Sequence, residues 1–343
     1  MELLQAIALP GAVGAFAALA LCLARMPIAR TMALVDVSDH PRKAHVGAVP
    51  LVGGIAMFPA IAIACVQAVA LGASEDAFGM MVGVVFGFFM IGYADDRMQI
   101  RPSRRLLLTL VLFAALVLMT PAFMPSIFEI GGLQLQIGPG TIALLAIIGA
   151  SGALNAINMA DGQDGLCVGL LLIWLLFLTL ESTTAVQSAA LLAALALAIV
   201  LMFNLLGLVF LGDIGAYGVG AFVLSLMLYG AGDGSIDHGQ IVALLAVPVV
   251  DCIFLMIERA RRGNSPYDPD RQHLHHILQA TFGKWPSLAV YLGAVGLCAV
   301  GACQNGWATP AAIACAIAFV VVSRWIGRRE VEVPSPAETG SQV

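Results

Sequence analysis

The sequence predicts an all-α polytopic membrane protein with about 11 transmembrane helices. Of its 343 residues, 60% are hydrophobic and only 11% are charged, whereas about a quarter of the residues in soluble domains are charged. The apolar runs are continuous, with the length of about 20 residues that a bilayer-crossing helix needs, and lack the alternation of a membrane β-barrel. Hydropathy places the spans at residues 3–24, 50–71, 77–94, 106–121, 140–157, 166–180, 185–203, 205–229, 240–258, 286–303 and 308–326.

Basic residues are confined to one side of this topology. All sixteen Lys and Arg residues end or follow an odd-numbered span, whereas the connections after even-numbered spans carry only acidic charges. The positive-inside rule makes the basic side cytoplasmic. The sequence therefore predicts a cytoplasmic C-terminus and a periplasmic or extracellular N-terminus. The basic residues are Arg25, Arg30, Arg42, Lys43, Arg97, Arg101, Arg104, Arg105, Arg259, Arg261, Arg262, Arg271, Lys284, Arg324, Arg328 and Arg329.

The chain is predicted to form one integral membrane domain, residues 1–327, followed by a short cytoplasmic tail, residues 328–343. The first apolar run lacks the small-residue cleavage site of a secretory signal, so we expect it to be retained as a span. The tail contains Pro, Ser and Glu and few apolar residues, and we expect it to be disordered.

Five polar segments lie on the same side as the basic residues. Loops that only connect helices need no paired Asp, clustered His or glycine-flanked Asp at the ends of apolar spans, and ionisable residues at membrane depth indicate function. We therefore expect the five segments to form one site. They are "SDHPRKAHVGAVPLVGG" (38–54), "GYADDRMQIRPSRR" (92–105), "NAINMADGQDG" (155–165), "FLGDIGAYGVG" (210–220) and "ERARRGNSPYDPDRQHLHH" (258–276).

The acids of these segments suit a hard cation. Asp95 and Asp96 are adjacent, so a helix points them about 100° apart, toward two different partners. Asp161 and Asp164 have the i, i+3 spacing that puts two side chains on one helical face, and Asp213 is flanked by glycine. Carboxylate and carbonyl oxygens favour Mg²⁺, bound together with substrate phosphates. A single acid pair would more often cap a helix or face solvent, but several groups on one side favour a site.

The histidine cluster suits a phosphate ligand better than a zinc ion. Arg271, His273, His275 and His276 lie in "PDRQHLHH". Structural zinc sites need closed N or S ligation, but no cysteine lies nearby, and adjacent His275 and His276 cannot easily bind one metal. Arg and His beside a carboxylate-held cation are suited to a pyrophosphate. The residues thus predict a Mg²⁺–phosphate site for one soluble phosphorylated substrate and one lipid-borne substrate.

In order and spacing, the segments resemble the motifs of the polyprenyl-phosphate N-acetylhexosamine-1-phosphate transferases, of the glycosyltransferase 4 type. The matching stretches are "RKAHVGAVPLVGG", "GYADDR", "NAINMADGQDGL", "FLGDIG" and "SPYDPDRQHLHH". "PDRQHLHH" is similar to the branch that uses UDP-N-acetylglucosamine. The resemblance implies a helical membrane bundle with an active-site cleft on the cytoplasmic side of the bacterial inner (plasma) membrane.

The resemblance also implies the reaction and its participants. A UDP-N-acetylhexosamine, most simply UDP-N-acetylglucosamine, donates its sugar-1-phosphate to undecaprenyl phosphate and releases UMP. The lipid-linked product would initiate a cell-surface polysaccharide, such as O-antigen of lipopolysaccharide or a cell-wall polymer. The implied cofactor is Mg²⁺, with Mn²⁺ as the alternative ion. A homodimer is compatible with the family, and no nucleic acid is implied as a partner.

Residue roles follow from the resemblance where the motifs match. Asp213 is the expected Mg²⁺ ligand and Asn158 its companion. Asp164 matches the position that contacts uracil, with Asn155 and Asp161 shaping the pocket.

The remaining matched residues concern the phosphates. Asp95 and Asp96 match the family's acidic pair, of which one is expected to deprotonate or position the lipid phosphate. Arg105 is expected near the phosphates. Lys43 and His45 belong to a basic loop near the lipid phosphate. The expected clamp on the pyrophosphate and sugar comprises Arg271, His273, His275 and His276, with His273 also expected to act in catalysis.

Two departures and several alternatives accompany this prediction. Ala216 stands where the family often has serine, so a hydroxyl near the metal is absent, and Pro41 lies a few residues later than the family's proline. N-acetylfucosamine or N-acetylquinovosamine could replace N-acetylglucosamine, because these sugars share the N-acetyl group. A membrane carrier is a different reading, but carriers place their acids near the bilayer midplane. An inactive scaffold protein is a third alternative, which only Ala216 favours.

Overall fold

The computed structural model describes residues 2–37, 48–125, 127–130, 132–263, 273–304 and 308–331. Within them the chain is helical apart from short loops and two small hairpins. The helices are α1 (Glu2–Leu23), α2 (Arg25–Met32), α3 (Gly53–Ala70), α4 (Glu75–Met98), α5 (Pro102–Met119), η1 (Pro121–Phe123), α6 (Pro139–Ala160), α7 (Leu166–Glu181), α8 (Thr184–Leu205), α9 (Gly212–Asp233), α10 (His238–Arg261), α11 (Leu274–Phe282), α12 (Lys284–Cys303) and α13 (Ala308–Val331). The antiparallel hairpins are β1 (Val35–Val37) with β2 (Ala48–Pro50), and β3 (Phe128–Ile130) with β4 (Leu133–Leu135).

The helices confirm the predicted all-α polytopic membrane fold. Among the described residues, nine helices are long and apolar enough to cross a membrane, and two shorter apolar segments, α7 and residues 309–325 of α13, complete the set. Each of the eleven expected spans therefore corresponds to one helix. The eighth begins later than expected, because Gly207 adopts a left-handed φ of 66° after α8 and α9 starts only at Gly212. Helix α13 continues to Val331, past the expected boundary at 327, and the rest of the tail lies outside the described residues.

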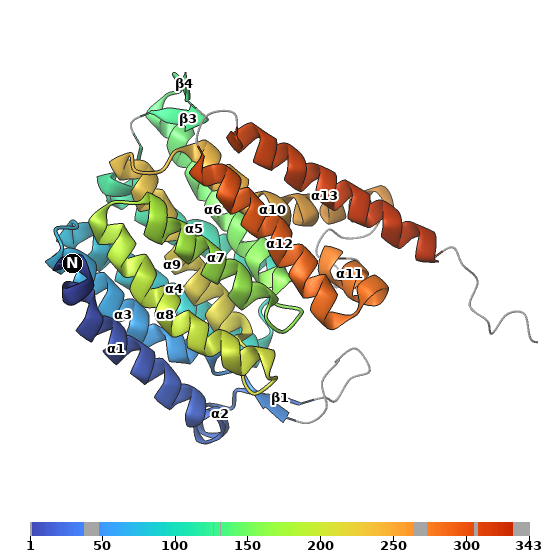
Figure 1. Cartoon of the computed structure of the whole chain (residues 1–343), viewed down its shortest axis with the longest axis horizontal. Helices are drawn as coiled ribbons and strands as arrows, with labels where there is room; N and C mark the ends of the chain where they lie inside the picture. The colour runs from blue at the N-terminus through green and yellow to red at the C-terminus, as the bar shows by residue number, and fades with distance from the viewer. Residues whose placement is uncertain are drawn as a thin grey trace, which may run out of the picture.

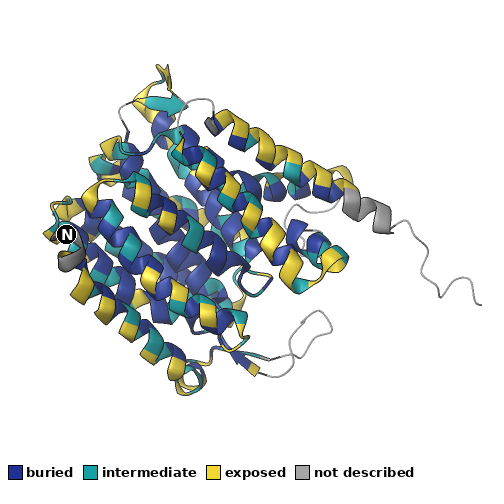
Figure 2. Cartoon of the chain, in the orientation of Figure 1, coloured by how far each residue is buried: buried dark blue, intermediate teal, exposed yellow. Residues whose placement is uncertain are grey.

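Helix α9 is the centre of the bundle. Between its terminal acids Asp213 and Asp233, its side chains are mainly apolar or small on every face, and most of its residues are buried. A helix that is hydrophobic all round belongs inside a larger assembly, and α9 accordingly packs against α3, α4, α6, α7 and α8. Exposed residues instead follow the outward sides of α1, α12 and α13 (Figure 2).

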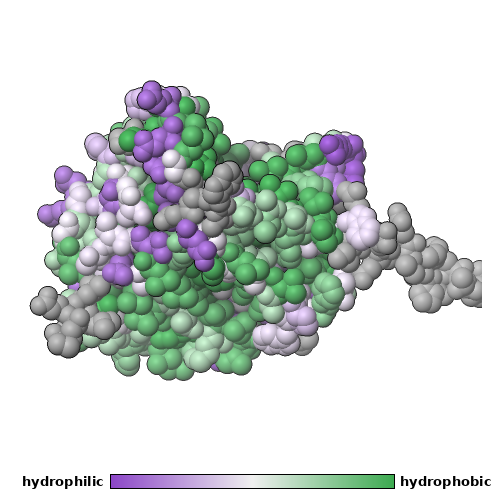
Figure 3. Space-filling view, turned by 45° about the horizontal axis from the view of Figure 1, so that its top comes forward, coloured by the Kyte–Doolittle hydropathy of each residue, from purple (hydrophilic) through white to green (hydrophobic). Residues whose placement is uncertain are grey.

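Two groups of helices complete the bundle. Helices α1, α3 and α8 pack together on one side of α9, while α10, α11, α12 and α13 form a second group (Figure 1). Hydrophobic residues cover most of the lower part of the face in Figure 3, and hydrophilic residues gather mainly in its upper left part, with a smaller group at the upper right. This division fits flanks in contact with lipid and polar ends in contact with water.

The described parts of the predicted polar segments gather at one end of the bundle. The β3–β4 hairpin lies at one end, and β1 and α11 lie toward the other (Figure 1). The C-terminal ends of α4 and α6 meet the N-terminal ends of α3, α5, α9, α11 and α12 at this second end. We call it the motif end, defined by residues 92–105, 155–165, 207–220 and 273–287.

Glycines allow three helices to meet closely at the motif end. A Cβ on Gly54 of α3 would lie 2.4 Å from the backbone nitrogen of Gly215, and one on Gly92 of α4 would lie 2.3 Å from the carbonyl oxygen of Asp213. The Gly54 amide also donates to the carbonyl of Leu211 at 3.1 Å. Any larger side chain at Gly54 or Gly92 would push α3 or α4 away from the start of α9.

Candidate active site

Asp95 and Asp96 contact different partners, as their adjacent positions predict. Asp95 is buried near the end of α4, where one carboxylate oxygen forms an ion pair with Arg105 of α5. The other oxygen accepts a hydrogen bond of 2.7 Å from the amide of Ile100. Asp95 therefore fixes the turn between α4 and α5 and holds the Arg105 guanidinium at the motif end.

Asp96 caps the helix that carries Asp213. Its two carboxylate oxygens accept hydrogen bonds from the amides of Asp213, at 3.1 Å, and Ile214, at 3.0 Å. Amides in the first turn of a helix have no intrahelical acceptor, and the positive end of the helix dipole attracts an anion. Asp96 thus caps the N-terminal end of α9.

Asp213 meets Asn158 across the site. The Asn158 side-chain amide of α6 donates to Asp213 Oδ1 at 3.0 Å. Tyr217, one turn further along α9, is fully buried, with Asn158 and Arg105 as polar neighbours of its hydroxyl. Asp95, Asp96 and Asp161 all act on Asp213 electrostatically. The predicted metal ligand therefore lies among carboxylates of like charge.

Asp161 and Asp164 do not share a helical face, so that prediction was wrong. Helix α6 ends at Ala160 and α7 begins at Leu166, and both acids lie in the intervening turn. Asp161 is the residue after α6, where burial raises the pKa of its carboxyl and the charges of Asp96 and Asp164 raise it further. Asp161 therefore belongs electrostatically to the carboxylate group around Asp213.

Asp164 faces the start of α12. Its carboxylate forms an ion pair of 2.7 Å with Lys284, and both side chains are partly exposed. The neighbouring Gln163 side chain donates to the Lys284 carbonyl at 2.9 Å and to Ser287 Oγ at 3.1 Å. These contacts fix the turn against α12. Asn155, one turn before the end of α6, donates to the Ser151 carbonyl at 2.8 Å and is half-buried.

The histidine cluster lies directly behind the same turn. A Cβ on Gly162 would lie 2.6 Å from His275 Nε2, so this glycine makes room for the imidazole. Burial, with further contributions from His276 and His273, lowers the pKa of His275 to about 3. The His275 ring is therefore neutral near pH 7 and packs between α11 and the turn. A role for it in substrate binding stays a prediction.

The structure describes His273 and His276 of the cluster but not Arg271. The ring centroids of His275 and His276 are 4.1 Å apart. His273 is the residue before α11, and its Nδ1 lies 3.2 Å from Asp251. Lys43, His45 and Arg271 lie outside the described residues.

The side chains around Asp213 fit a cation whose remaining ligands come from the substrate. Among the described residues, no group of three or more His, Cys, Asp and Glu side chains could hold a metal ion alone. Mg²⁺ is usually bound by one or two carboxylates together with water and substrate phosphates, which suits Asp213 with Asn158 beside it. Crowded carboxylates disfavour one another's charge, and a cation would relieve this repulsion.

Sequence reasoning missed three residues of this region. Lys284 was counted only as a basic loop residue, Tyr217 only as part of the α9 motif, and Asp251 was absent from the motifs. A signal did exist for Asp251, because an acid in the apolar run "VPVVDCIFLM" is expensive unless it is paired.

Comparisons with known proteins agree with these motifs. The family model described as glycosyl transferase family 4 matches residues 77–231, which contain Asp95 and Asp96, the turn after α6 and Asp213. The chain is 30% identical over 264 residues to the undecaprenyl-phosphate alpha-N-acetylglucosaminyl 1-phosphate transferase of Yersinia pestis, covering 73% of this chain and 71% of that protein.

Two further relatives extend the match. The protein of the same name from Salmonella typhi is 30% identical over 299 residues, covering 81% of this chain and 77% of the relative. The decaprenyl-phosphate N-acetylglucosaminephosphotransferase of Mycolicibacterium smegmatis is 28% identical over 316 residues, covering 82% and 78%. With its helical bundle and its five ordered motifs, the chain belongs to glycosyl transferase family 4, as a multi-pass membrane protein.

Proposed function

We propose that the protein transfers N-acetylglucosamine-1-phosphate from UDP-N-acetylglucosamine to undecaprenyl phosphate and releases UMP. The observation that carries the proposal is the meeting of Asp95, Asp96, Asp213 and Asn158 with Arg105 at one end of the bundle. Transfer between two phosphates needs cationic groups, because both reactants are anionic. The relatives from Yersinia pestis and Salmonella typhi are named undecaprenyl-phosphate alpha-N-acetylglucosaminyl 1-phosphate transferases, which supports the transferred group and the lipid acceptor of this proposal.

Asp213 and Asn158 would hold the Mg²⁺ cofactor, for which Mn²⁺ is the alternative. When bound, the ion would neutralise charge on the pyrophosphate and improve UMP as a leaving group. Asp213 lies at the N-terminus of α9, where the Asp96 cap holds its backbone in place. The Asn158 amide donates to Asp213, which orients the carboxylate toward the motif end.

Transfer by direct attack suits the acid pair better than a covalent aspartyl intermediate. Both oxygens of Asp96 accept from backbone amides, and both oxygens of Asp95 are engaged by Ile100 and Arg105. A phosphate monoester is already largely ionised near neutral pH. An oxygen of the lipid phosphate would therefore attack the sugar-bearing phosphorus, and the bond from that phosphorus to the UMP oxygen would break. The bonding electrons would leave with UMP.

The nucleotide would lie against the turn of residues 161–165. Asp164 would contact uracil, and its ion pair with Lys284 would hold its carboxylate in place. Asn155 and Asp161 would shape the pocket from the end of α6. Arg105, held by Asp95, would lie near the phosphates, where a guanidinium stabilises developing charge.

The remaining predicted contacts come from the two basic loops. Arg271, His273 and His276 would clamp the pyrophosphate and sugar, and Lys43 and His45 would meet the lipid phosphate. The excess of Lys and Arg at the motif end supports a cytoplasmic site in the bacterial inner membrane. The product would initiate a cell-surface polysaccharide, and a homodimer is compatible with this arrangement.

A donor panel tests the substrate. Purified protein in detergent would be given undecaprenyl phosphate, Mg²⁺ and, separately, UDP-N-acetylglucosamine, UDP-N-acetylfucosamine and UDP-N-acetylquinovosamine. We expect lipid-linked pyrophosphoryl sugar chiefly from the first donor. Preferential transfer of a 6-deoxy sugar would correct the donor, and lipid product from none would contradict the transferase proposal.

A further inference from the structure

A buried ion pair connects the last helix of the bundle to the histidine cluster. Asp251 of α10 and Arg324 of α13 are each only 4% exposed. Arg324 Nη2 lies 2.8 Å from Asp251 Oδ1 and 3.3 Å from the Asp251 carbonyl. Arg324 Nη1 also lies 3.3 Å from Glu258. Desolvation offsets much of the attraction within a buried ion pair, so stability alone does not explain why this pair is buried here.

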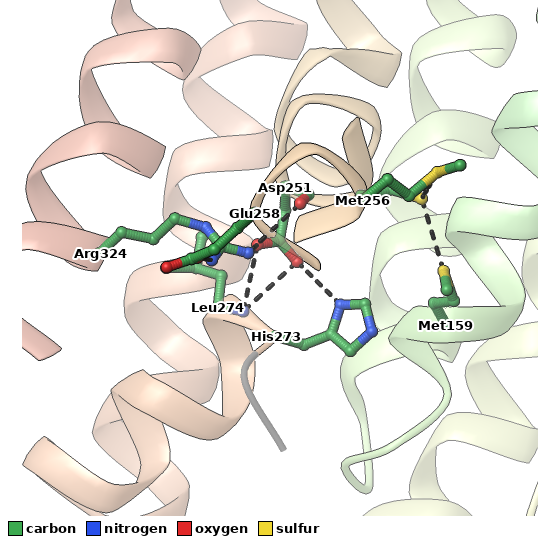
Figure 4. Close-up of polar contacts among 8 residues, drawn as sticks. Met159, Asp251, Met256, Glu258, His273, Leu274 and Arg324 are labelled. Carbon is green, nitrogen blue, oxygen red and sulfur yellow. Dashed lines mark hydrogen bonds and ion pairs between the residues drawn. The ribbon is translucent and has the colours of Figure 1, made fainter. Parts of the chain in front are cut away.

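The Asp251 carboxylate reaches the first residues of α11. The Leu274 amide donates to its two oxygens at 3.2 and 3.3 Å, and His273 Nδ1 lies 3.2 Å from Oδ2 (Figure 4). His273, the residue before α11, makes no side-chain cap hydrogen bond to this helix. Asp251 therefore supplies the anion that the start of this helix favours.

The contact with Asp251 also determines which nitrogen of His273 carries a proton. An ionised carboxylate can only accept hydrogen bonds, so His273 Nδ1 must be the protonated nitrogen that donates. In a ring that carries one proton, Nε2 is then an acceptor. In Figure 4 the ring points from Asp251 toward the α6 ribbon that carries Met159. The same residues, with His275 and Tyr291, line a small cavity.

Arg324 holds Asp251 from the opposite direction. Its guanidinium remains charged at any working pH and lies 4.9 Å from the Phe254 ring centroid, which adds a further contact. Because Arg324 binds Oδ1 while His273 lies at Oδ2, the carboxylate cannot rotate without losing one partner. The orientation of His273 thus depends on a residue of α13, outside the range that the family model matches.

We propose that Asp251 is a positioning residue for His273 in the transfer reaction, and that Arg324 on the last helix holds Asp251 in place. This inference rests on the proposed function, which assigns His273 to the phosphates. A ring held at Nδ1 presents Nε2 in one orientation. The ring therefore samples fewer orientations that are unproductive for the transfer reaction. Misplacing a reacting group by about 1 Å can reduce turnover on the order of 100-fold.

Kinetics of four variants test the proposal in full-length protein. Asp251→Asn removes the carboxylate charge, Arg324→Gln removes the holding charge, and Arg324→Lys keeps it with fewer donors. Arg262→Gln is the matched control, because half-exposed Arg262 pairs with Glu258, the second carboxylate that Arg324 contacts, so this variant disturbs that carboxylate while leaving Asp251 and Arg324 in place.

We expect kcat to fall about 10- to 100-fold in Asp251→Asn and Arg324→Gln, while the KM for the UDP-sugar changes less than about threefold. Arg324→Lys should recover part of the lost kcat, and Arg262→Gln should behave as wild type. Equal kcat in Arg324→Gln and Arg262→Gln would overturn the proposal. So would an Arg324→Lys variant that is well folded but as slow as Arg324→Gln.

A spectroscopic measurement tests the same contact without turnover. In protein labelled with ¹⁵N-histidine, the His273 signals would be assigned by their loss in His273→Gln. We expect the Nδ1–H tautomer in wild type and a mixture of tautomers in Asp251→Asn. An unchanged tautomer in Asp251→Asn would contradict the proposal. If wild type turned over no donor, the proposed function would fail, and this measurement would still decide whether Asp251 positions His273.

Discussion

The carboxylate of Asp96 on α4 accepts the backbone amide of Asp213 on α9, at 3.1 Å. The second oxygen accepts the next amide, that of Ile214. The contact joins two motifs that are 117 residues apart in the chain. Asp96 therefore caps the end of α9 that carries the candidate metal ligand, Asp213. Asp95, the other acid of the pair, holds Arg105.

Replacing Asp96 should destabilise the start of α9. Asp96→Ala removes both acceptors from the first turn, and loss of a helix cap costs about 1 kcal/mol. Asp96→Asn keeps one oxygen acceptor and should lose less. Thermal unfolding in detergent measures both, with Asp76→Ala, an exposed acid at the other end of α4, as control. Equal unfolding temperatures for Asp96→Ala and Asp76→Ala would contradict the capping role.

Two glycines of α4 should respond oppositely to alanine. Gly92→Ala places a Cβ 2.3 Å from the Asp213 carbonyl and should lower both unfolding temperature and turnover, because α4 and α9 must separate. Gly79 has no atom within 4 Å of an added Cβ. Gly79→Ala should therefore leave turnover unchanged and stabilise the helix by about 0.5–1 kcal/mol. A Gly92→Ala protein as stable and active as Gly79→Ala would show that the close approach is unimportant.

Asp164 should affect nucleotide affinity. If its carboxylate contacts uracil, Asp164→Ala should raise the KM for the UDP-sugar about tenfold, which corresponds to about 1.4 kcal/mol of binding, with a smaller effect on kcat. Lys284→Met keeps the aliphatic stem but removes the ion pair and should raise KM less. Steady-state kinetics over a range of donor concentrations separate the two effects. An unchanged KM in Asp164→Ala would remove this residue from the nucleotide pocket.

Mild acid should destabilise the protein through His275. Its folded-state pKa of about 3 lies below the ordinary value of 6.5. Between these two pH values the imidazole is protonated in the unfolded chain but not in the folded protein. The contribution of His275 to the free energy of unfolding is therefore fully present above about pH 6.5. It falls as pH decreases toward 3, by up to about 1.4 kcal/mol per pH unit. His275→Gln should unfold with a weaker dependence on pH. The unfolding temperature at about pH 7.5 and pH 5 checks this prediction, and the same pH dependence in both proteins would contradict it.

The sequence predicted the bundle because hydropathy and charge act through local composition. Eleven apolar runs and the placement of Lys and Arg were enough to find each long helix of the described residues and the common end of the described motifs. Adjacency alone also predicted that Asp95 and Asp96 would reach different partners.

Contacts between distant segments could not be predicted in this way. The i, i+3 spacing of Asp161 and Asp164 suggested a helix, but α6 ends at Ala160, and Gly165, with a φ of 84°, immediately precedes α7. Arg324 was counted only as one more basic residue at the end of a span, although it binds Asp251 73 residues away. Spacing reports the period of one element and carries no information on which elements pack together.

The most direct test of the account is UMP release by the purified protein in detergent with UDP-N-acetylglucosamine. We expect release that requires both undecaprenyl phosphate and Mg²⁺ and that is abolished in Asp213→Ala, although that variant remains folded. UMP release that persists without lipid phosphate or in Asp213→Ala, or no release from a folded wild-type preparation, would contradict the proposed transferase site.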